Sequence, residues 1–198
     1  MNFNFKNLKE FFRDKSRDNL YQNLKDIGVD CNLAERGLNE EKLFNPWHRR
    51  SLGLININSD EPIKYINIIK QDGGKNNPPR WWYFFAIPDN KIISKDKSIE
   101  VKSIRKKSTP LIGKVESVNW EPNSNSNNLA KIFTDDDDIN SLSINLGDIK
   151  VQSLHDNFSG FSIELEFKVK EKKLNQTSWA TLNKIAKYCL QEIGRAHV

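Results

Sequence analysis

Residues able to ligate a metal or perform acid–base chemistry are few and scattered along this sequence. Its histidines are His48, His155 and His197, and its two cysteines, Cys31 and Cys189, stand far apart. A zinc site needs three or four such ligands held together, and no H-x-H, H-E-x-x-H or C-x-x-C spacing occurs. We therefore predict no metal site and no cofactor, and we interpret both cysteines as buried free thiols.

Four consecutive aspartates at 135–138 form the most prominent acidic cluster and the best candidate for a cation site. An EF-hand loop, however, needs ligands at alternate positions, a glycine at its sharp turn and a later bidentate Glu. The Ile-Asn-Ser that follows supplies none of these. The run is more typical of a helix cap or a solvated turn.

Signatures of catalysis are missing from the sequence as well. It contains no G-x-S-x-G, G-x-x-x-x-G-K-[ST] or G-x-G-x-x-G pattern. His48 is followed by Arg49 and Arg50, and such a cluster suits contact with an anion better than binding of a metal. We lean towards a non-enzymatic protein, with a catalytic site assembled from residues distant in sequence as the open alternative.

A basic region in the middle of the chain stands out from the rest of the sequence. Residues 61–120 carry a net charge of +6, whereas residues 1–60 carry +1 and residues 121–198 carry −2. Lysine is abundant together with Asn and Ile, as in proteins encoded by AT-rich genes, which weakens the lysine excess as a signal. The excess is concentrated at 91–114, where the candidate polyanion-binding residues are Lys102, Arg105, Lys106, Lys107 and Lys114.

The aromatic run that precedes the basic region allows two interpretations. Trp81, Trp82 and Tyr83 follow Arg80, and aromatic side chains beside cations on a sheet can stack nucleic-acid bases. Residues 81–87 are nevertheless apolar at both parities, which is typical of a strand buried on both faces. We favour a core role for these aromatics, and we keep nucleic-acid or other polyanion binding as the alternative function.

Our leading functional hypothesis is protein association through the N-terminus. Apolar residues recur there at helical spacing among charged ones, which predicts a short amphipathic helix or an arm. Such a face can dock on its own domain, on a protein partner or on a second copy of the chain, and a membrane surface is the alternative. This partner-docking set comprises Phe3, Phe5, Leu8, Phe11 and Phe12.

The two ends of the chain bear on where the protein resides and how it was encoded. The N-terminus lacks the unbroken apolar stretch of a secretory signal, and no window is long and apolar enough for a transmembrane segment. With its lone cysteines, this predicts a cytoplasmic protein. Residues 193–198 correspond to the DNA sequence ATCGGAAGAGCACACGTC, which resembles a sequencing-library adapter. We therefore interpret these residues as read-through, so that the true C-terminus beyond about residue 192 is unknown.

Hydrophobic patterning predicts helices near both ends of the chain and strands between them. With 37% apolar and 10% aromatic residues among 198, the chain can build a core, which excludes wholesale disorder. Successive strand patterns without an intervening helix favour an antiparallel meander. We predict an α+β fold, a mainly antiparallel sheet packed against N-terminal and C-terminal helices. The expected helices are 16–27, 129–133 and one from 177, and the expected strands are 29–33, 51–57, 63–69, 81–87, 99–104, 111–120, 149–154 and 161–169.

These elements suggest three consecutive parts. Residues 1–34 form an N-terminal helical segment plus a short strand, and residues 51–120 form the antiparallel sheet core. Residues 129–192 form a strand–hairpin–helix part, either of the same domain or of a small subdomain that begins after the polar loop at 121–128.

Overall fold

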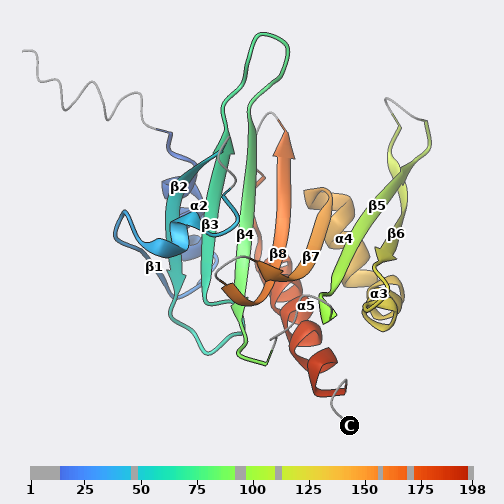
Figure 1. The fold of residues 1–198 in the computed structure, drawn as a ribbon. Coiled ribbons are helices and arrows are strands. Elements are labelled where there is room, and N and C mark those ends of the chain that lie inside the picture. Colours follow the sequence, from blue (N-terminus) through green and yellow to red (C-terminus); the bar gives the residue numbers. More distant parts are fainter. Residues whose placement is uncertain are drawn as a thin grey trace, which may run out of the picture.

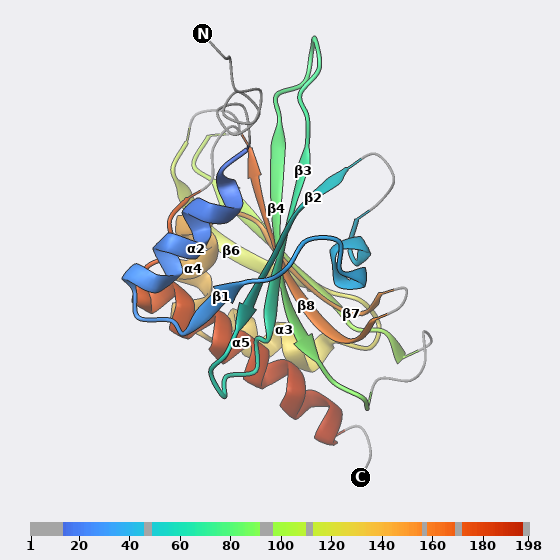
Figure 2. The ribbon, with the colours of Figure 1, turned by 90° about the vertical axis from the view of Figure 1, so that its left-hand side faces the viewer.

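The computed structural model describes residues 14–45, 49–91, 97–109, 113–155, 158–168 and 172–195. In this part of the chain, eight strands form a single sheet in which every pairing is antiparallel. The α-helices pack on one face of the sheet, as Figures 1 and 2 show. The structure therefore confirms the predicted α+β fold with helices from both ends of the chain.

The order of the strands departs from a simple meander at one place. Neighbouring strands run β1-β2-β3-β4-β8-β7-β5-β6, so the β7–β8 hairpin lies between β4 and β5 (Figure 1). The 11-residue strand β8 pairs with the whole length of β4, from Arg80↔Lys168 to Pro88↔Gly160. The strands are β1 (Cys31–Leu33), β2 (Arg50–Ile57), β3 (Tyr65–Gln71), β4 (Arg80–Pro88), β5 (Glu100–Lys107), β6 (Val115–Pro122), β7 (Ile149–His155) and β8 (Phe158–Lys168).

The helices cover the inner face of the sheet and close the main core. They are α2 (Ser16–Asp26), α3 (Asn127–Thr134), α4 (Asp137–Leu146) and α5 (Gln176–Arg195). Of these, α4 was not predicted, although the cap that starts it was. The Asp136 carboxylate accepts the backbone N–H groups of Asp138 and Ile139 at 3.1 and 3.2 Å. The helical form of 193–195 does not bear on the read-through interpretation of 193–198, which stays a prediction.

The aromatic run on β4 fills the core on both faces of the sheet. Trp81, Trp82 and Tyr83 are 8%, 2% and 2% exposed, which confirms the core interpretation of these side chains. Trp81 and Tyr83 belong to the main core, whereas Trp82 belongs with Ile69 and Phe84 to a second cluster on the outer face. The aromatic rings of this strand are therefore unavailable as an open stacking platform.

A segment at 38–45, which we call the strap, covers that second cluster from the outer face (Figure 2). It contains the short 3-10 helix η1 (Asn39–Lys42), followed by Phe44, whose ring stacks on Phe84 with centroids 4.9 Å apart. The buried amide of Asn67 donates to the backbone carbonyl of Leu43 at 2.9 Å, while its oxygen accepts the Ser51 hydroxyl at 2.8 Å. The strap is thus fastened to β2 and β3 by one buried side chain.

An ion pair joins the chain before α2 to β3 and makes stability depend on pH. Asp14 Oδ2 lies 2.6 Å from Lys70 Nζ, and Asp14 Oδ1 accepts the Ser16 N–H at 2.9 Å. Burial opposes ionisation of Asp14, but these hydrogen bonds outweigh it and lower its pKa from 3.8 to about 2.

Replacing Asp14→Asn is expected to reduce the free energy of unfolding by about 2 kcal/mol at pH 7. The pKa of Asp14 is lower in the folded state than in the unfolded state. The extra stability of the wild-type protein over the variant is therefore complete above about pH 5 and is lost as the pH falls towards about 2. Urea unfolding of both proteins at pH 7, 5, 4 and 3 measures this. A difference that is the same at pH 7 and pH 3 would contradict the assignment.

Candidate functional site

β5 and β6 form a two-stranded arm that leaves the sheet. They pair with each other from Val101↔Pro122 to Lys107↔Val115, whereas β5 pairs with β7 only from Glu100 to Lys102. Beyond Lys102 the hairpin separates from β7 and projects past the end of the sheet (Figure 1). We call residues 103–109 and 113–119 the arm.

The base of the arm is fixed by buried contacts. Ser103, 4% exposed, accepts the Ile149 N–H through its hydroxyl at 2.8 Å, where a continued β5–β7 ladder would place a backbone carbonyl. On β6, Trp120 donates from Nε1 to Asn140 of α4 at 2.9 Å and packs edge-on against Phe133 of α3 at 5.0 Å. The arm therefore projects from a rigid support.

All five predicted polyanion-binding residues lie on β5 or on the arm, but their charges are not equally available. Lys102 Nζ lies 2.6 Å from Glu100, and Arg105 Nε lies 2.7 Å from Asp148, so both cations have a carboxylate partner. Lys106, Lys107 and Lys114 are exposed, and within the described residues none of them lies within 4 Å of a carboxylate. Of these five residues, the three near the tip of the arm thus carry the uncompensated charge.

Local backbone structure brings the three tip lysines together. The register shifts between Lys106 and Lys107, and such a β-bulge re-aims the side chains on either side of it. Ser108 N–H then donates to the Lys114 carbonyl at 3.0 Å, which places Lys114 across the hairpin from the end of β5. The tip therefore presents cations from both strands.

Further cations gather at the same end of the sheet. The β3–β4 hairpin projects from the same end of the sheet, with β8 and β7 between it and the arm (Figure 1), and carries the exposed Lys75. The chain that follows β8 carries the exposed Lys172 and Lys173, and Lys172 shares a small cavity with Arg105. The sequence interpretation missed these three lysines, although the lysine-rich stretch at 168–173 was a usable signal.

The outer face of the sheet is charged but largely self-neutralised. Glu100 lies 3.0 Å from Lys150, and Glu166 lies 3.1 Å from Arg80. Burial raises the pKa of Glu164, which lies near the positive charges of Lys150 and Arg49. With its cations facing carboxylates, this face is a poorer surface for a polyanion than the arm.

The described part of the chain gives little support for metal binding, membrane insertion or thiol chemistry. No group of three or more His, Cys, Asp or Glu there could hold a metal ion, and no helix there is both long and apolar enough to cross a membrane. Burial raises the pKa of the Cys31 thiol, which keeps it protonated and weakly nucleophilic.

Comparison with protein-family models, with curated proteins and with solved structures finds no match to this chain. Function has to be inferred from the arm and its charges. The predicted partner-docking set, from Phe3 to Phe12, lies outside the described residues, and so does His48. Protein association through that set therefore stays a prediction, as does the cytoplasmic location.

Proposed function

We propose that the protein binds nucleic acid through its phosphate backbone, with the arm as the principal contact. The observation that carries this proposal is the set of three exposed lysines at the tip, Lys106, Lys107 and Lys114, none paired with a carboxylate among the described residues. A two-stranded ribbon has dimensions that the major groove of a duplex accommodates. Lysines at its tip then neutralise phosphates and release the condensed counterions.

The buried aromatics of β4 determine which kind of binding is expected. Single strands are usually held by stacking of bases on exposed aromatic rings. Trp81, Trp82 and Tyr83 are at most 8% exposed and cannot provide that platform. Binding is therefore expected to be independent of sequence and to favour duplex over single strand.

Fluorescence anisotropy with a labelled 20-base-pair duplex tests the proposal directly. At 50 mM NaCl we expect a dissociation constant of about 10 µM or tighter, within the range typical of non-specific binding, and weaker binding of the single strand. Polyglutamate of matched length serves as an acidic polymer without phosphates and should compete poorly. Undetectable duplex binding, or equal competition by polyglutamate, would refute a nucleic-acid function.

Neutralising the arm tip should weaken duplex binding selectively. The triple variant Lys106→Gln, Lys107→Gln, Lys114→Gln (the arm variant) is expected to lose about 10- to 100-fold in affinity at 50 mM NaCl. The matched control is Lys25→Gln, Lys131→Gln, Lys187→Gln (the helix variant), which removes the same charge from exposed positions on α2, α3 and α5. The helix variant should stay within about twofold of wild type; an equal loss in both would show that net charge, not the arm, drives binding.

Protein association through the N-terminal docking set is the second proposal, and it rests on the sequence pattern alone. Light scattering after size-exclusion chromatography, applied to the full chain and to a chain that starts at residue 14, measures it. The proposal expects a higher mass for the full chain or a partner retained only by it. Identical monomers with no retained partner would count against it.

A further inference from the structure

We propose that Ser108, at the end of the arm, is a phosphorylation site for a protein kinase that takes basic substrates, and that the phosphate weakens duplex binding. Ser108 follows Arg105, Lys106 and Lys107, and it is the one Ser or Thr of the sequence that three consecutive cations precede. Kinases select substrates by the charges beside the hydroxyl, and an acidic substrate cleft matches this run. The effect on duplex binding rests on the proposed function, whereas the modification itself does not.

The Ser108 side chain is accessible to an enzyme. β5 ends at Lys107, so Ser108 follows the last residue of the strand, and the arm carries it away from the sheet (Figure 1). The residue is exposed, and its hydroxyl has no hydrogen-bond partner among the described residues. Its backbone N–H donates to the Lys114 carbonyl at 3.0 Å. A kinase can therefore reach the hydroxyl without opening the core.

A second serine beside cations lacks this access. Ser51 follows Arg49 and Arg50, but it lies within β2. Its hydroxyl donates to the Asn67 side chain at 2.8 Å and accepts the Gly53 N–H at 3.0 Å. The Ser51 hydroxyl is thus engaged inside the fold, and Ser51 serves as an internal control for Ser108.

The modification is a phosphoryl transfer from ATP. The Ser108 Oγ bonds to the γ-phosphorus while the bond from that phosphorus to the β–γ bridging oxygen breaks. ADP leaves, and the hydroxyl proton passes to the catalytic carboxylate of the kinase. The phosphoserine then carries a charge of about −1.5 to −2 at pH 7.

A phosphate on Ser108 would lie among the three tip lysines. Lys106 and Lys107 precede it, and Lys114 lies across the hairpin from it. It would cancel about half to two-thirds of their combined positive charge. Its oxygens also offer these ammonium groups the same kind of ligand that a duplex does. The modified arm therefore loses attraction for nucleic acid while its backbone is unchanged.

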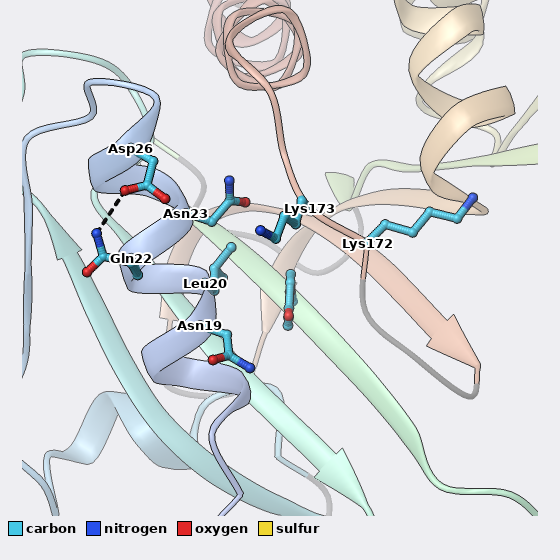
Figure 3. Close-up of a pocket in the computed structure, with 8 residues that line it drawn as sticks. Asn19, Leu20, Gln22, Asn23, Asp26, Lys172 and Lys173 are labelled. Atoms are coloured by element: carbon cyan, nitrogen blue, oxygen red, sulfur yellow. Dashed lines mark hydrogen bonds between the residues drawn. The ribbon is translucent and has the colours of Figure 1, made fainter.

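The cavity between α2 and the chain that follows β8 does not offer a phosphate a comparable site. Figure 3 shows that Lys172 points away from α2, and its ammonium donates to the Asn145 carbonyl. The ammonium of Lys173 then remains against the single carboxylate of the lining, Asp26. The apolar lining residues are at most 3% exposed. The described lining thus provides no excess of cations, in contrast to the tip of the arm.

Treatment of the full chain with ATP, Mg²⁺ and the catalytic subunit of cyclic-AMP-dependent protein kinase, a probe that takes basic substrates, tests the site. We expect one phosphate per chain by intact mass, located on Ser108 by peptide fragmentation, with Ser51 unmodified in the folded protein. Ser108→Ala should lose this phosphate. Thr109→Ala, which removes the neighbouring exposed hydroxyl, is the matched control and should keep it.

Duplex binding of each protein is then compared before and after treatment. For wild type and Thr109→Ala, the dissociation constant of the 20-base-pair duplex at 50 mM NaCl should rise about 10-fold or more. For Ser108→Ala, treatment should leave it unchanged. These comparisons isolate the phosphate from any effect of the substitutions themselves.

Three results would overturn this proposal: no phosphate on Ser108, equally fast modification of Ser51, or unchanged duplex binding by the phosphorylated protein. Absence of duplex binding before treatment would remove the proposed function and the effect of the phosphate with it. The mass of the treated protein still decides whether Ser108 is modified. Failure of the modification and failure of the arm are thus distinguished.

Discussion

Replacing Gly160→Ala is expected to lower the free energy of unfolding by about 3 kcal/mol or more, because the methyl group has no space and the backbone is strained for it. Gly160 has φ +143° and lies directly beside β4. A Cβ there would stand 2.1 Å from the Ile87 carbonyl oxygen and 2.8 Å from the Asp89 nitrogen. Both are backbone atoms, one in the central strand β4 and one directly after it, and they cannot move without disturbing the β4–β8 ladder.

Gly37→Ala is the matched control for this substitution. Gly37 also has a positive φ, +87°, but a Cβ built on it meets nothing within 4 Å. Gly37→Ala should lower the free energy of unfolding by only about 1 kcal/mol, which is the cost of holding an alanine in a left-handed conformation. Urea unfolding of the two variants therefore separates backbone strain from steric exclusion; equal losses would mean that β8 does not approach β4 as closely as described.

The second large effect is expected for Asn67→Asp, which keeps the shape of the side chain and removes its donor. The Nδ2 group donates to the carbonyls of Leu43 at 2.9 Å and of Glu40 and Glu41 at 3.3 Å. A carboxylate oxygen in its place would face three carbonyl oxygens in a site that is 0% exposed. We expect a loss of about 3–5 kcal/mol, typical of an uncompensated buried charge.

The same variant should release the strap before the rest of the fold. Hydrogen exchange at the backbone amides of residues 38–45 is expected to accelerate, while that of β4 and β8 changes less, because the hydrogen bonds that are lost hold the strap itself. Asn119→Asp, at an exposed position of β6, is the control and should change neither stability nor exchange appreciably. Unaltered exchange of the strap in Asn67→Asp would refute its role as the fastening.

Local patterns were sufficient to predict most elements, because each depends on neighbours in sequence. The apolar character of residues 81–87 at both parities indicated a strand buried on both faces, and β4 is one. Helix α4 was missed even though Ile139, Leu142 and Leu146 have helical spacing, because Asp, Asn and Ser, which favour caps and turns, make up six of its ten residues. Its cap was recognised, but a cap alone does not give the length of a helix.

Strand order and charge pairing could not be predicted, because they join residues distant in sequence. Residues 99–104 and 161–169 both have strand patterns, and nothing local indicates that β8 rather than β5 adjoins β4. Similarly, the basic region was visible, but the pairing of Arg105 with Asp148 across 43 positions was not. That pairing is what leaves the tip of the arm, rather than its base, with uncompensated charge.

Salt dependence of duplex binding tests the role of the arm most directly. For the wild-type protein and the arm variant, the logarithm of the association constant is plotted against the logarithm of NaCl concentration, and each phosphate contact contributes about 0.9 to the slope. If Lys106, Lys107 and Lys114 contact phosphates, the slope of the arm variant is smaller in magnitude by about 2 to 3, while that of the helix variant equals wild type. Parallel lines for wild type and the arm variant would contradict the account.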